Sequence, residues 1–338
     1  MRLLIVKLSA LGDVIQTLPA IALLKKEWPF VKIDWVVEER NGALLIAHPF
    51  VSNTLLFKRE LFTKPKEFAF FLRKLRSEKY TAVVDFQGLF KSAFLVLFSK
   101  AQYKIGFANH REGSPLFYNV KLRPYDPDLH AVRRYLLLAR KTISYLTFGK
   151  EIEVEVEREI PREIPLPEKR PPMEFPKPYM LLVAGARWET KIWPYSHWET
   201  LLKLTEDQRK NLDFYFIGAK TEEALRRFAE TMSERYTGVF SLVGKLDLPE
   251  LVYVIKRSEG VITIDTGPMH LASLLNKPIL ALFGPTSPQR TGPWSERFIT
   301  LTAKLPCQPC FKRKCKSLSC MISLSPEQVV EELSNLRV

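Results

Sequence analysis

Three segments of the sequence place polar side chains directly after an apolar run and before a helical pattern, which is where ligands bind in open α/β sheets. The first contains Gly12 and Asp13 and follows the apolar residues 3–6. Asp13 has two interpretations. It is the N-cap of the next helix, since Asp is among the commonest N-cap residues, or it is a carboxylate that removes a proton from an attacking hydroxyl.

The second segment is Asp-Thr-Gly-Pro-Met-His, residues 265–270. Thr266 and Gly267 are expected to present backbone N–H groups at the start of a helix, and such a helix terminus binds anions such as a diphosphate. His270 lies one turn further along. Alone it is as easily a capping or core residue, but together with Asp265 and its neighbours it favours a ligand-binding role.

The third segment is Gly-Ala-Arg-Trp-Glu-Thr-Lys-Ile-Trp-Pro, residues 185–194. Arg187 and Lys191 can offer positive charge to a departing phosphate, although exposed loop cations are more often only solvated. The chain has no GxGxxG after its first apolar run and no GxxxxGK[ST] motif, which argues against a standard dinucleotide dehydrogenase or a P-loop enzyme. We therefore expect phosphate to be bound by some structure other than these two glycine-rich loops.

A group of cysteines lies near the end of the chain in the order C-x2-C-x4-C-x4-C. Its members are Cys307, Cys310, Cys315 and Cys320. Four thiolates fit a tetrahedral zinc site. Two disulfides, an iron–sulfur cluster and free thiols are the alternatives. In each bonded state the expected role is structural, because no partner base can be assigned for catalysis by a cysteine.

Apolar runs alternate with helical patterns in both halves of the chain. Strands are expected at residues 3–6, 33–37, 82–85, 179–183, 214–217, 261–264 and 278–283, and helices at residues 67–79 and 325–336. Strands that alternate with helices predict parallel βαβ units. Seven prolines between positions 161 and 178 exclude a helix or an interior strand there and predict a linker.

The bulk composition favours two domains and an anionic partner. A length of 338 residues exceeds the roughly 250–300 residues at which single cores stop growing. The net charge is +14, and residues 1–150 hold 25 Lys and Arg against 12 Asp and Glu, whereas the remainder holds 26 against 25. This surplus indicates nucleic acid, an acidic lipid surface or a phosphorylated substrate as a partner of the first half, unless it is simply a solvated Lys-rich surface.

Membrane insertion and export are not expected. No apolar run reaches the roughly 18 residues needed to span a bilayer, and the apolar N-terminal run is too short for a signal peptide. We therefore expect a cytoplasmic protein.

Several motifs together resemble those of the ADP-heptose:lipopolysaccharide heptosyltransferases, which form glycosyltransferase family 9, and they are most similar to heptosyltransferase I. The motifs are KLSALGDVIQTLP at 7–19, DWVVEE at 34–39, DFQGLFKS at 85–92, DTGPMHLA at 265–272 and FGPT at 283–286. The resemblance implies the α/β GT-B architecture, with two Rossmann-like parallel-sheet domains facing a central cleft. It also implies inversion at the anomeric carbon, ADP-L-glycero-β-D-manno-heptose as donor and the Kdo-lipid A inner core as acceptor.

The resemblance assigns roles by position. Asp13 matches the proposed general base and Lys191 the lysine that contacts the donor phosphates. The remaining expected donor-binding positions are Ala186, Arg187, Glu222, Asp265, Thr266, Gly267 and His270. Glu222 would contact the nucleotide ribose, and Ala186 and Arg187 stand where many members have hydroxyl residues. The cysteine group is similar to that of some heptosyltransferase II relatives.

The expected domains are an acceptor-binding domain at 1–160, a linker at 161–178, a nucleotide-sugar domain at 179–322 and a C-terminal helix at 323–338. A basic first domain suits Kdo carboxylates and lipid A phosphates. The candidate acceptor contacts are Ser9, Gly12, Arg59, Lys64, Lys66, Lys91, Arg111 and Arg133. Catalysis is expected to need no cofactor or divalent metal, and the protein is expected to associate peripherally with the cytoplasmic face of the inner membrane.

The residues by themselves are also compatible with two other functions. The first is another sugar-nucleotide enzyme of the same architecture, such as a heptosyltransferase II, a transferase with a different donor or an epimerase. The second is a nucleic-acid-binding protein with a zinc module, which would explain the charge and the cysteines but not residues 265–270. We therefore expect no nucleic-acid partner.

Overall fold

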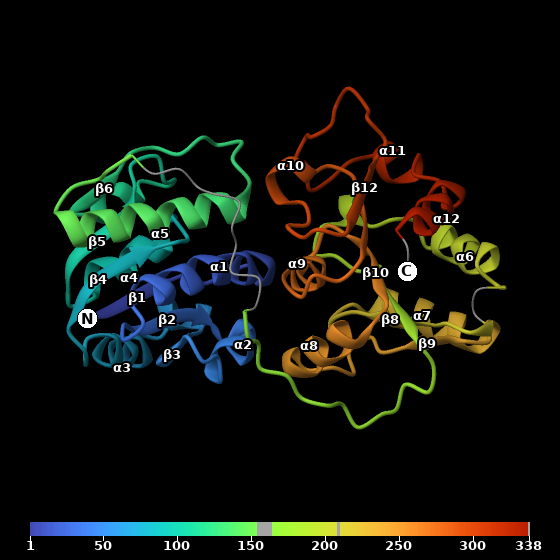
Figure 1. Ribbon diagram of the computed structural model, residues 1–338, viewed down its shortest axis with the longest axis horizontal. Coiled ribbons are helices and arrows are strands. Elements are labelled where there is room, and N and C mark those ends of the chain that lie inside the picture. Colours follow the sequence, from blue (N-terminus) through green and yellow to red (C-terminus); the bar gives the residue numbers. More distant parts are fainter. Residues whose placement is uncertain (154–163, 208–209, 337–338) are drawn as a thin grey trace. The chain divides into compact units, whose positions relative to one another are not determined.

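The computed structural model describes residues 1–153, 164–207 and 210–336. The chain divides into two compact units, Met1–Pro167 and Glu168–Val338, and each is described by itself (Figure 1). The division falls within the proline-rich stretch predicted as a linker, of which residues 161–163 lie outside the described part of the chain.

The described residues of the first unit form a six-stranded sheet of order β3-β2-β1-β4-β5-β6 in which all neighbours are parallel. Its strands are β1 (Arg2–Val6), β2 (Lys32–Glu38), β3 (Asn53–Phe57), β4 (Tyr80–Asp85), β5 (Ala101–Phe107) and β6 (Val120–Leu122). The central strands β1 and β4 are largely apolar, with polar residues mainly near their ends, because helices cover both faces of a parallel sheet.

Helices connect these strands in the first unit. They are α1 (Leu11–Glu27), α2 (Ala43–Ile46), α3 (Pro65–Leu75), α4 (Phe90–Phe98) and α5 (Ala131–Phe148), with short 3-10 turns η1 (Glu39–Asn41), η2 (Arg59–Thr63) and η3 (Ser114–Phe117). Helices α1 and α5 pack against each other. The helix predicted at 67–79 begins earlier and ends earlier, at Pro65 and Leu75. Proline is favoured in the first helical turn because its φ is already helical.

The second unit repeats this topology in its described residues, with the strand order β12-β11-β10-β7-β8-β9, again all parallel. Its strands are β7 (Tyr179–Val183), β8 (Asp213–Ile217), β9 (Val239–Ser241), β10 (Gly260–Ile264), β11 (Ile279–Phe283) and β12 (Phe298–Thr302). Counted within its own unit, each sheet has the order 3-2-1-4-5-6 of the Rossmann fold. The prediction of two Rossmann-like α/β domains is confirmed.

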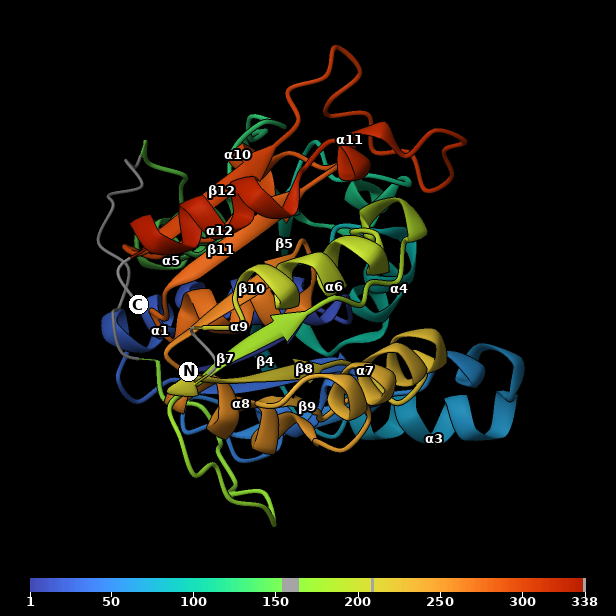
Figure 2. The same ribbon diagram turned by 90° about the vertical axis from the view of Figure 1, so that its right-hand side faces the viewer.

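Helices cover both faces of the second sheet. They are η4 (Glu189–Lys191), α6 (Tyr195–Leu204), α7 (Glu223–Arg235), α8 (Leu248–Arg257), α9 (Gly267–Leu274), α10 (Pro288–Thr291), α11 (Ser319–Ile322) and α12 (Pro326–Asn335). Helices α8 and α9 lie on one face, and α6, α7 and α12 on the other (Figure 1). Figure 2 shows α12 beside α6, with which it packs. The predicted C-terminal helix is present and is capped by Ser325, whose Oγ accepts a hydrogen bond from the Gln328 N–H at 3.3 Å.

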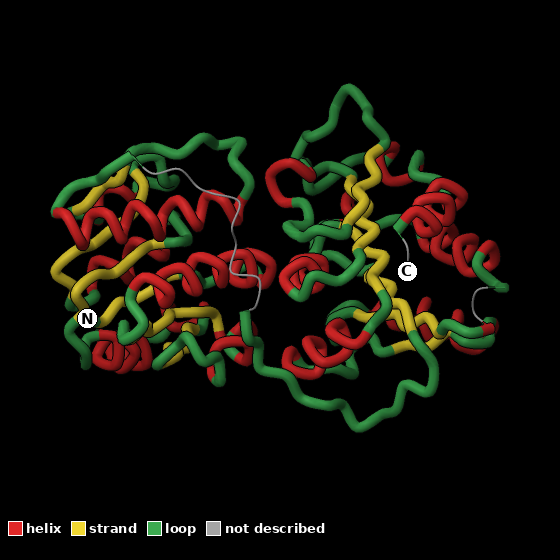
Figure 3. Tube along the Cα trace, viewed as in Figure 1, coloured by secondary structure: helices red, strands yellow, loops and turns green. Residues whose placement is uncertain are grey.

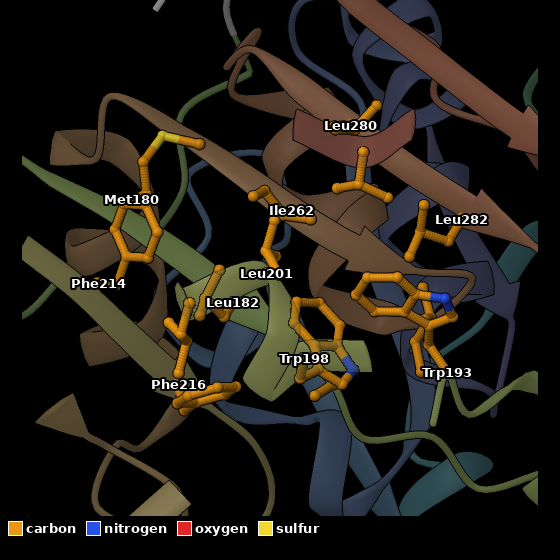
Figure 4. Packing of buried hydrophobic residues seen from close by; sticks show 14 of the residues in the cluster. Met180, Leu182, Trp193, Trp198, Leu201, Phe214, Phe216, Ile262, Leu280 and Leu282 are labelled. Carbon is orange, nitrogen blue, oxygen red and sulfur yellow. The ribbon is translucent and has the colours of Figure 1, made fainter. Parts of the chain in front are cut away.

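An aromatic core holds the loop that follows β7 (Figure 4). The rings of Trp193 and Trp198 meet edge to face with centroids 4.9 Å apart, and both are fully buried. The Trp193 indole N–H donates to the Leu324 carbonyl at 2.8 Å, and buried indole N–H groups usually have such a partner. The end of the loop at residues 185–194 is therefore fixed to the core.

Both sheets reverse their strand order at a central pair, β1 with β4 and β7 with β10. In open α/β sheets, ligands bind beyond the carboxyl ends of the strands at the point where the strand order reverses. Figure 3 shows how strands and helices alternate in each unit. Among the described residues, no helix combines the length and the apolar composition that crossing a membrane would require.

Candidate active site

Asp13 lies in the first turn of α1, just after the loop that leaves β1. Ala10 is the N-cap of this helix, so the N-cap interpretation of Asp13 is wrong. Asp13 Oδ2 instead accepts a hydrogen bond from the Ala10 N–H at 3.0 Å, and Oδ1 accepts one from the Tyr135 hydroxyl at 2.9 Å. The carboxylate supports the helix start from within the helix and remains 37% exposed.

Positive charge surrounds this carboxylate. The buried Lys7 Nζ lies 3.7 Å from Asp13 Oδ1 and donates to the Tyr135 hydroxyl at 2.8 Å, while the Arg134 guanidinium lies 5.1 Å from the centroid of the Tyr135 ring. Burial would raise the pKa of Asp13, but the charge of Lys7 and the hydrogen bonds from Ala10 and Tyr135 outweigh it, so the pKa lies below its usual value. Asp13 is therefore ionised at neutral pH.

Helix α5 places Arg134 beside the Asp13 site, whereas the sequence predicted the adjacent Arg133 as an acceptor contact. Arg133 is exposed, whereas its neighbour Arg134 is half-buried, close to the rings of Tyr125 and Tyr135. Successive helical residues differ by about 100° in direction, so only one of the two arginines can face Asp13. Neither Arg134 nor Tyr135 carries a local sequence signal for this position.

The loop between β1 and α1 is held by side chains from neighbouring strands and loops. Gln87 Oε1 accepts hydrogen bonds from the N–H groups of Leu8 and Ser9, both at 3.1 Å. The Trp35 indole donates to the Lys7 carbonyl at 3.0 Å. Ser9 is nearly buried and Gly12 is buried; their role in acceptor binding stays a prediction.

Asp85, in the motif at 85–92, has a structural role in this loop network. Its Oδ1 accepts from the N–H groups of Gln87 and Gly88, both at 3.0 Å, and its Oδ2 accepts from Ser92 Oγ at 2.9 Å and Tyr118 OH at 2.7 Å. Burial raises its pKa despite these bonds. Four donors on one fully buried carboxylate fix the turn between β4 and α4, which places Gln87 under the Asp13 loop.

Glu38, the last residue of β2, gathers three cations at the carboxyl edge of the first sheet. Arg59 Nε and Lys91 Nζ each lie 2.9 Å from Glu38 Oε1, and Arg40 Nη2 lies 2.8 Å from Oε2. One carboxylate among three cations leaves a net positive charge. The structure thus brings together Arg59 and Lys91, which the sequence predicted as acceptor contacts, and adds Arg40. We call these four residues the Glu38 cluster.

The other predicted acceptor cations lie outside this cluster. Lys64 pairs with Glu67 at 3.3 Å, with both side chains exposed. Arg111 is exposed and its backbone N–H donates to the Gly88 carbonyl at 3.0 Å. Lys66 is exposed on the first turn of α3. Their contact with an acceptor stays a prediction.

In the second unit, Lys191 and Asp265 form a nearly buried ion pair, with Lys191 Nζ 2.7 Å from Asp265 Oδ2. Lys191 Nζ also lies 3.3 Å from the Asp265 carbonyl oxygen. His270 Nε2 lies 3.9 Å from Asp265 Oδ1. Thr266 is the N-cap of α9 and Gly267 its first residue. The structure therefore brings a lysine, a histidine and a helix N-terminus, each predicted for donor binding, to one point after β10.

Two cations lie close to the ring of Trp188, which belongs to the loop that follows β7. Lys191 Nζ is 4.8 Å and Arg313 Cζ 4.9 Å from the centroid of its ring, at which distances cations are attracted to an indole face. Arg187 is exposed and Ala186 packs on the core. Donor binding by Ala186 and Arg187 stays a prediction, and Arg313 was not predicted because it lies 125 residues from Trp188 in the sequence.

Glu222 precedes α7 and lies over the ends of β7 and β8. A Cβ atom on either Gly185 or Gly218 would overlap its carboxylate. Glu222 Oε2 accepts a hydrogen bond from the Ala219 N–H at 2.7 Å, and burial raises the pKa of this carboxyl. The two glycines therefore make room for a carboxyl group at the carboxyl edge of the second sheet.

The cysteine segment, residues 307–320, contacts the loop at residues 185–194 and the turn after β11. Thr190 Oγ1 donates to the Lys312 carbonyl at 2.8 Å, and the Phe311 N–H donates to the Pro285 carbonyl at 2.8 Å. All four cysteines are free thiols in the structure: Cys307 and Cys315 are exposed, Cys310 is half-buried and Cys320 is buried. Four thiols suit a soft metal, but within the described residues no three such side chains are grouped as a ligand set. Zinc binding stays a prediction.

Comparison with known proteins identifies relatives along the whole chain. It is 29% identical over 324 residues to lipopolysaccharide heptosyltransferase 1 of Pseudomonas aeruginosa, covering 93% of this chain and 87% of that protein. It is 28% identical to the Escherichia coli K12 enzyme of the same name, covering 99% and 100%. The structure of E. coli heptosyltransferase WaaC with ADP-2-deoxy-2-fluoro heptose superposes with a TM-score of 0.75 at 26% identity, covering 98% and 100%.

The family model described as glycosyltransferase family 9 (heptosyltransferase) matches residues 69–320, which include the Asp85 turn, Lys191 and the start of α9. This match and the two-Rossmann architecture agree. The chain belongs to glycosyltransferase family 9, the heptosyltransferases, and is a glycosyltransferase of GT-B type.

Proposed function

We propose that this enzyme transfers heptose from ADP-L-glycero-β-D-manno-heptose to the Kdo-lipid A inner core of lipopolysaccharide, with inversion at the anomeric carbon. The observation that carries the proposal is the convergence of Lys191, Asp265 and the N-terminus of α9 at one point. A lysine ammonium and helix N–H groups suit a diphosphate. The curated relatives bear the name lipopolysaccharide heptosyltransferase 1.

In the proposed reaction Asp13 acts as the general base. The acceptor hydroxyl oxygen forms a bond to the anomeric carbon of heptose while the bond from that carbon to the diphosphate breaks, and Asp13 takes the hydroxyl proton. ADP leaves with the electron pair, and its new charge is stabilised by Lys191 and the α9 amides. The proposal requires that Asp13 of the first unit reach a donor held by the second.

The lowered pKa of Asp13 keeps the carboxylate ionised and able to accept a proton, but it also makes Asp13 a weaker base. A carboxylate with a low pKa accepts little proton density from an unreacted hydroxyl, whose own pKa is far higher. It accepts the proton once the hydroxyl oxygen has begun to bond to carbon and has become acidic. Lys7 and Tyr135 keep Asp13 ionised and oriented until then.

We propose that the nucleotide lies along the carboxyl edge of the second sheet, with its ribose near Glu222. On the first unit, the Glu38 cluster offers net positive charge at the same edge of the sheet as Asp13. This suits the carboxylates of Kdo and the phosphates of lipid A. Such a lipid-linked acceptor would place the enzyme at the cytoplasmic face of the inner membrane.

We propose that no divalent metal takes part in the transfer, because Lys191 and the α9 terminus supply the positive charge. The sequence contains one Asp-x-Asp pair, Asp126 and Asp128. Asp126 Oδ1 accepts a hydrogen bond from the Asp128 N–H at 2.9 Å, which is the pattern of a turn. Full transfer in excess EDTA is expected; loss of transfer that Mg²⁺ or Mn²⁺ restores would refute this part of the proposal.

The decisive experiment is to incubate the protein with ADP-heptose and Kdo-lipid A and to measure product mass and anomeric configuration. We expect one added heptose with inverted configuration. Asp13→Asn should lower kcat by about 10²- to 10⁴-fold, the usual contribution of a general base, while ADP binding measured by calorimetry stays unchanged. Transfer only to a heptosylated core would indicate a type II enzyme, and transfer from a different sugar nucleotide would indicate another donor.

A further inference from the structure

Helix α4 carries a row of apolar side chains that reaches the surface of the first unit. Phe90, Phe94 and Leu97 recur at the spacing of one helix face. Phe90 is 52% exposed and Leu97 42% exposed. The ring of Phe94 lies 4.8 Å from that of Phe98 and 6.4 Å from that of Phe90. The phenylalanine rings of the row are therefore in contact with one another along α4.

Two neighbouring elements extend this row. The Phe117 ring of η3 meets Phe90 edge to face at 5.8 Å, and the adjacent Leu116 is 81% exposed. The Phe68 ring of α3 stacks on Phe94 at 6.0 Å. We call Phe90, Phe94, Leu97, Leu116 and Phe117 the α4 apolar surface. Phe90, Leu97 and Leu116 are exposed, whereas Phe94 and Phe117 are half-buried. Neighbouring exposed apolar side chains are uncommon on proteins without a partner, whereas single ones are normal.

Basic side chains border the α4 apolar surface. Lys104 Nζ donates to the Leu97 carbonyl at 2.8 Å, and Lys100 lies just beyond the end of α4 and is exposed. At the other end, Lys91 follows Phe90 directly. Lys64 is the N-cap residue of α3 and Lys66 lies in its first turn, and both precede Phe68.

Three acidic groups lie close to these five cations, and one of them is Glu38, which pairs with Lys91 at 2.9 Å. Glu112 Oε2 accepts a hydrogen bond from the Phe90 N–H at 3.1 Å, and Glu67 pairs with Lys64. The border therefore retains a net positive charge. Aromatic and aliphatic side chains with a cationic border are the composition of a surface that lies on an anionic membrane.

We propose that the α4 apolar surface docks the first unit on the anionic phospholipid bilayer, with Phe90 and Leu116 inserted among the lipids and the lysines at the headgroups. Lys91 belongs both to this border and to the Glu38 cluster. Helix α4 would therefore place the cations proposed for the acceptor beside the membrane. Bilayer binding needs no substrate, so this inference can be tested whether or not the proposed transfer reaction is correct.

The test is sedimentation of the full-length protein with vesicles of phosphatidylglycerol and phosphatidylethanolamine, compared with vesicles of phosphatidylcholine alone. We expect binding to the anionic vesicles to exceed binding to the neutral ones at least tenfold and to fall with salt, because the electrostatic part is screened. Phe90→Ser with Leu116→Ser should lower the vesicle-bound fraction at least tenfold.

The matched control is Phe30→Ser with Phe148→Ser. These phenylalanines are 95% and 62% exposed but lie outside the α4 apolar surface, so vesicle binding should be unchanged. If the double variant at Phe90 and Leu116 fails to fold, Leu116→Ser alone answers the question, because an 81% exposed side chain contributes little to the core. A charge variant, Lys100→Glu, should weaken binding to anionic vesicles only.

Three outcomes would overturn the proposal: equal vesicle binding by the double variant and the wild type, equal binding to neutral and anionic vesicles, or a concentration-dependent dimer that the double variant abolishes. The last would make the surface a contact with a second copy of the chain. Transfer to a soluble acceptor without acyl chains should be the same for wild type and double variant, which separates failure of docking from failure of the proposed chemistry.

Discussion

The Tyr135 hydroxyl donates a hydrogen bond to Asp13 Oδ1 at 2.9 Å although 122 residues separate them. The same hydroxyl accepts a hydrogen bond from Lys7 Nζ at 2.8 Å. Helix α5, which packs on α1, thus completes the environment of a carboxylate at the start of α1. A residue that touches neither substrate in our proposal sets the orientation and acidity of the proposed base.

Replacing Lys7 should shift the acid side of the pH profile. In the wild type the pKa of Asp13 is lowered, so the ionised base is lost, and kcat/KM falls, only at pH values below the usual range for an aspartate. Lys7→Met removes the nearest positive charge and leaves burial to raise the pKa. The acid limb of kcat/KM should therefore move to higher pH.

The control for this shift is Arg133→Gln, on the exposed side of α5, which should leave the pH profile in place. Arg134→Gln should move it in the same direction as Lys7→Met. A Lys7→Met enzyme with a lower rate but an unmoved acid limb would show that Lys7 supports the loop without tuning Asp13.

Removing the Lys191 ammonium should slow departure of ADP. Lys191→Met should lower kcat by about 10²- to 10³-fold, the loss seen when one preorganised group that stabilises developing charge is removed. The affinity for ADP, measured by calorimetry, should also fall. The matched control is Lys203→Met, an exposed lysine of α6 that pairs with Glu199 at 3.5 Å. Retention of the wild-type kcat would remove Lys191 from the proposed mechanism.

Adding one methyl group at Gly185 should displace Glu222. The new Cβ would overlap the Glu222 carboxylate, so Gly185→Ala should raise the KM for ADP-heptose and leave the KM for the acceptor unchanged. Truncation in Glu222→Ala removes the overlap. If crowding is the only effect of the methyl group, the double variant should have the donor KM of Glu222→Ala alone. A double variant much worse than that would mean that Gly185 itself needs close approach of the ligand.

The Glu38 cluster should bind the acceptor rather than the donor. Arg59→Gln should raise the KM for Kdo-lipid A about tenfold, since a hydrogen bond to a charged group contributes about 1.5 kcal/mol or more. The donor KM should not change. Lys150→Gln, at an exposed position after α5, is the control. If Arg59→Gln changed only the KM for the donor, the Glu38 cluster would bind the donor and the prediction would be wrong.

The sequence alone predicted two parallel α/β domains, seven of the twelve described strands and most of the donor motif; β3, β5, β6, β9 and β12 were not predicted. Buried parallel strands are largely apolar, so the apolar runs at β1, β4, β7 and β10 can be recognised without knowing what packs on them. Asp265 to His270 is similarly local, because a strand end and the helix that follows it are contiguous in the chain. The helix α3 was predicted but misplaced at its ends, which depend on capping rather than on periodicity.

Tertiary structure alone decided which side chains meet. Tyr135 reaches Asp13, Arg40 joins Arg59 at Glu38, and the cysteine segment meets Thr190, because the order of strands and the rotation of helices bring distant segments together. The sequence predicted Arg133 where the structure places Arg134 near Asp13. Two adjacent arginines look equivalent in a sequence, and only the packing of α5 on α1 shows which of them faces the carboxylate. Periodicity encodes which face of a helix is buried, whereas the identity of its neighbour is a property of the folded chain.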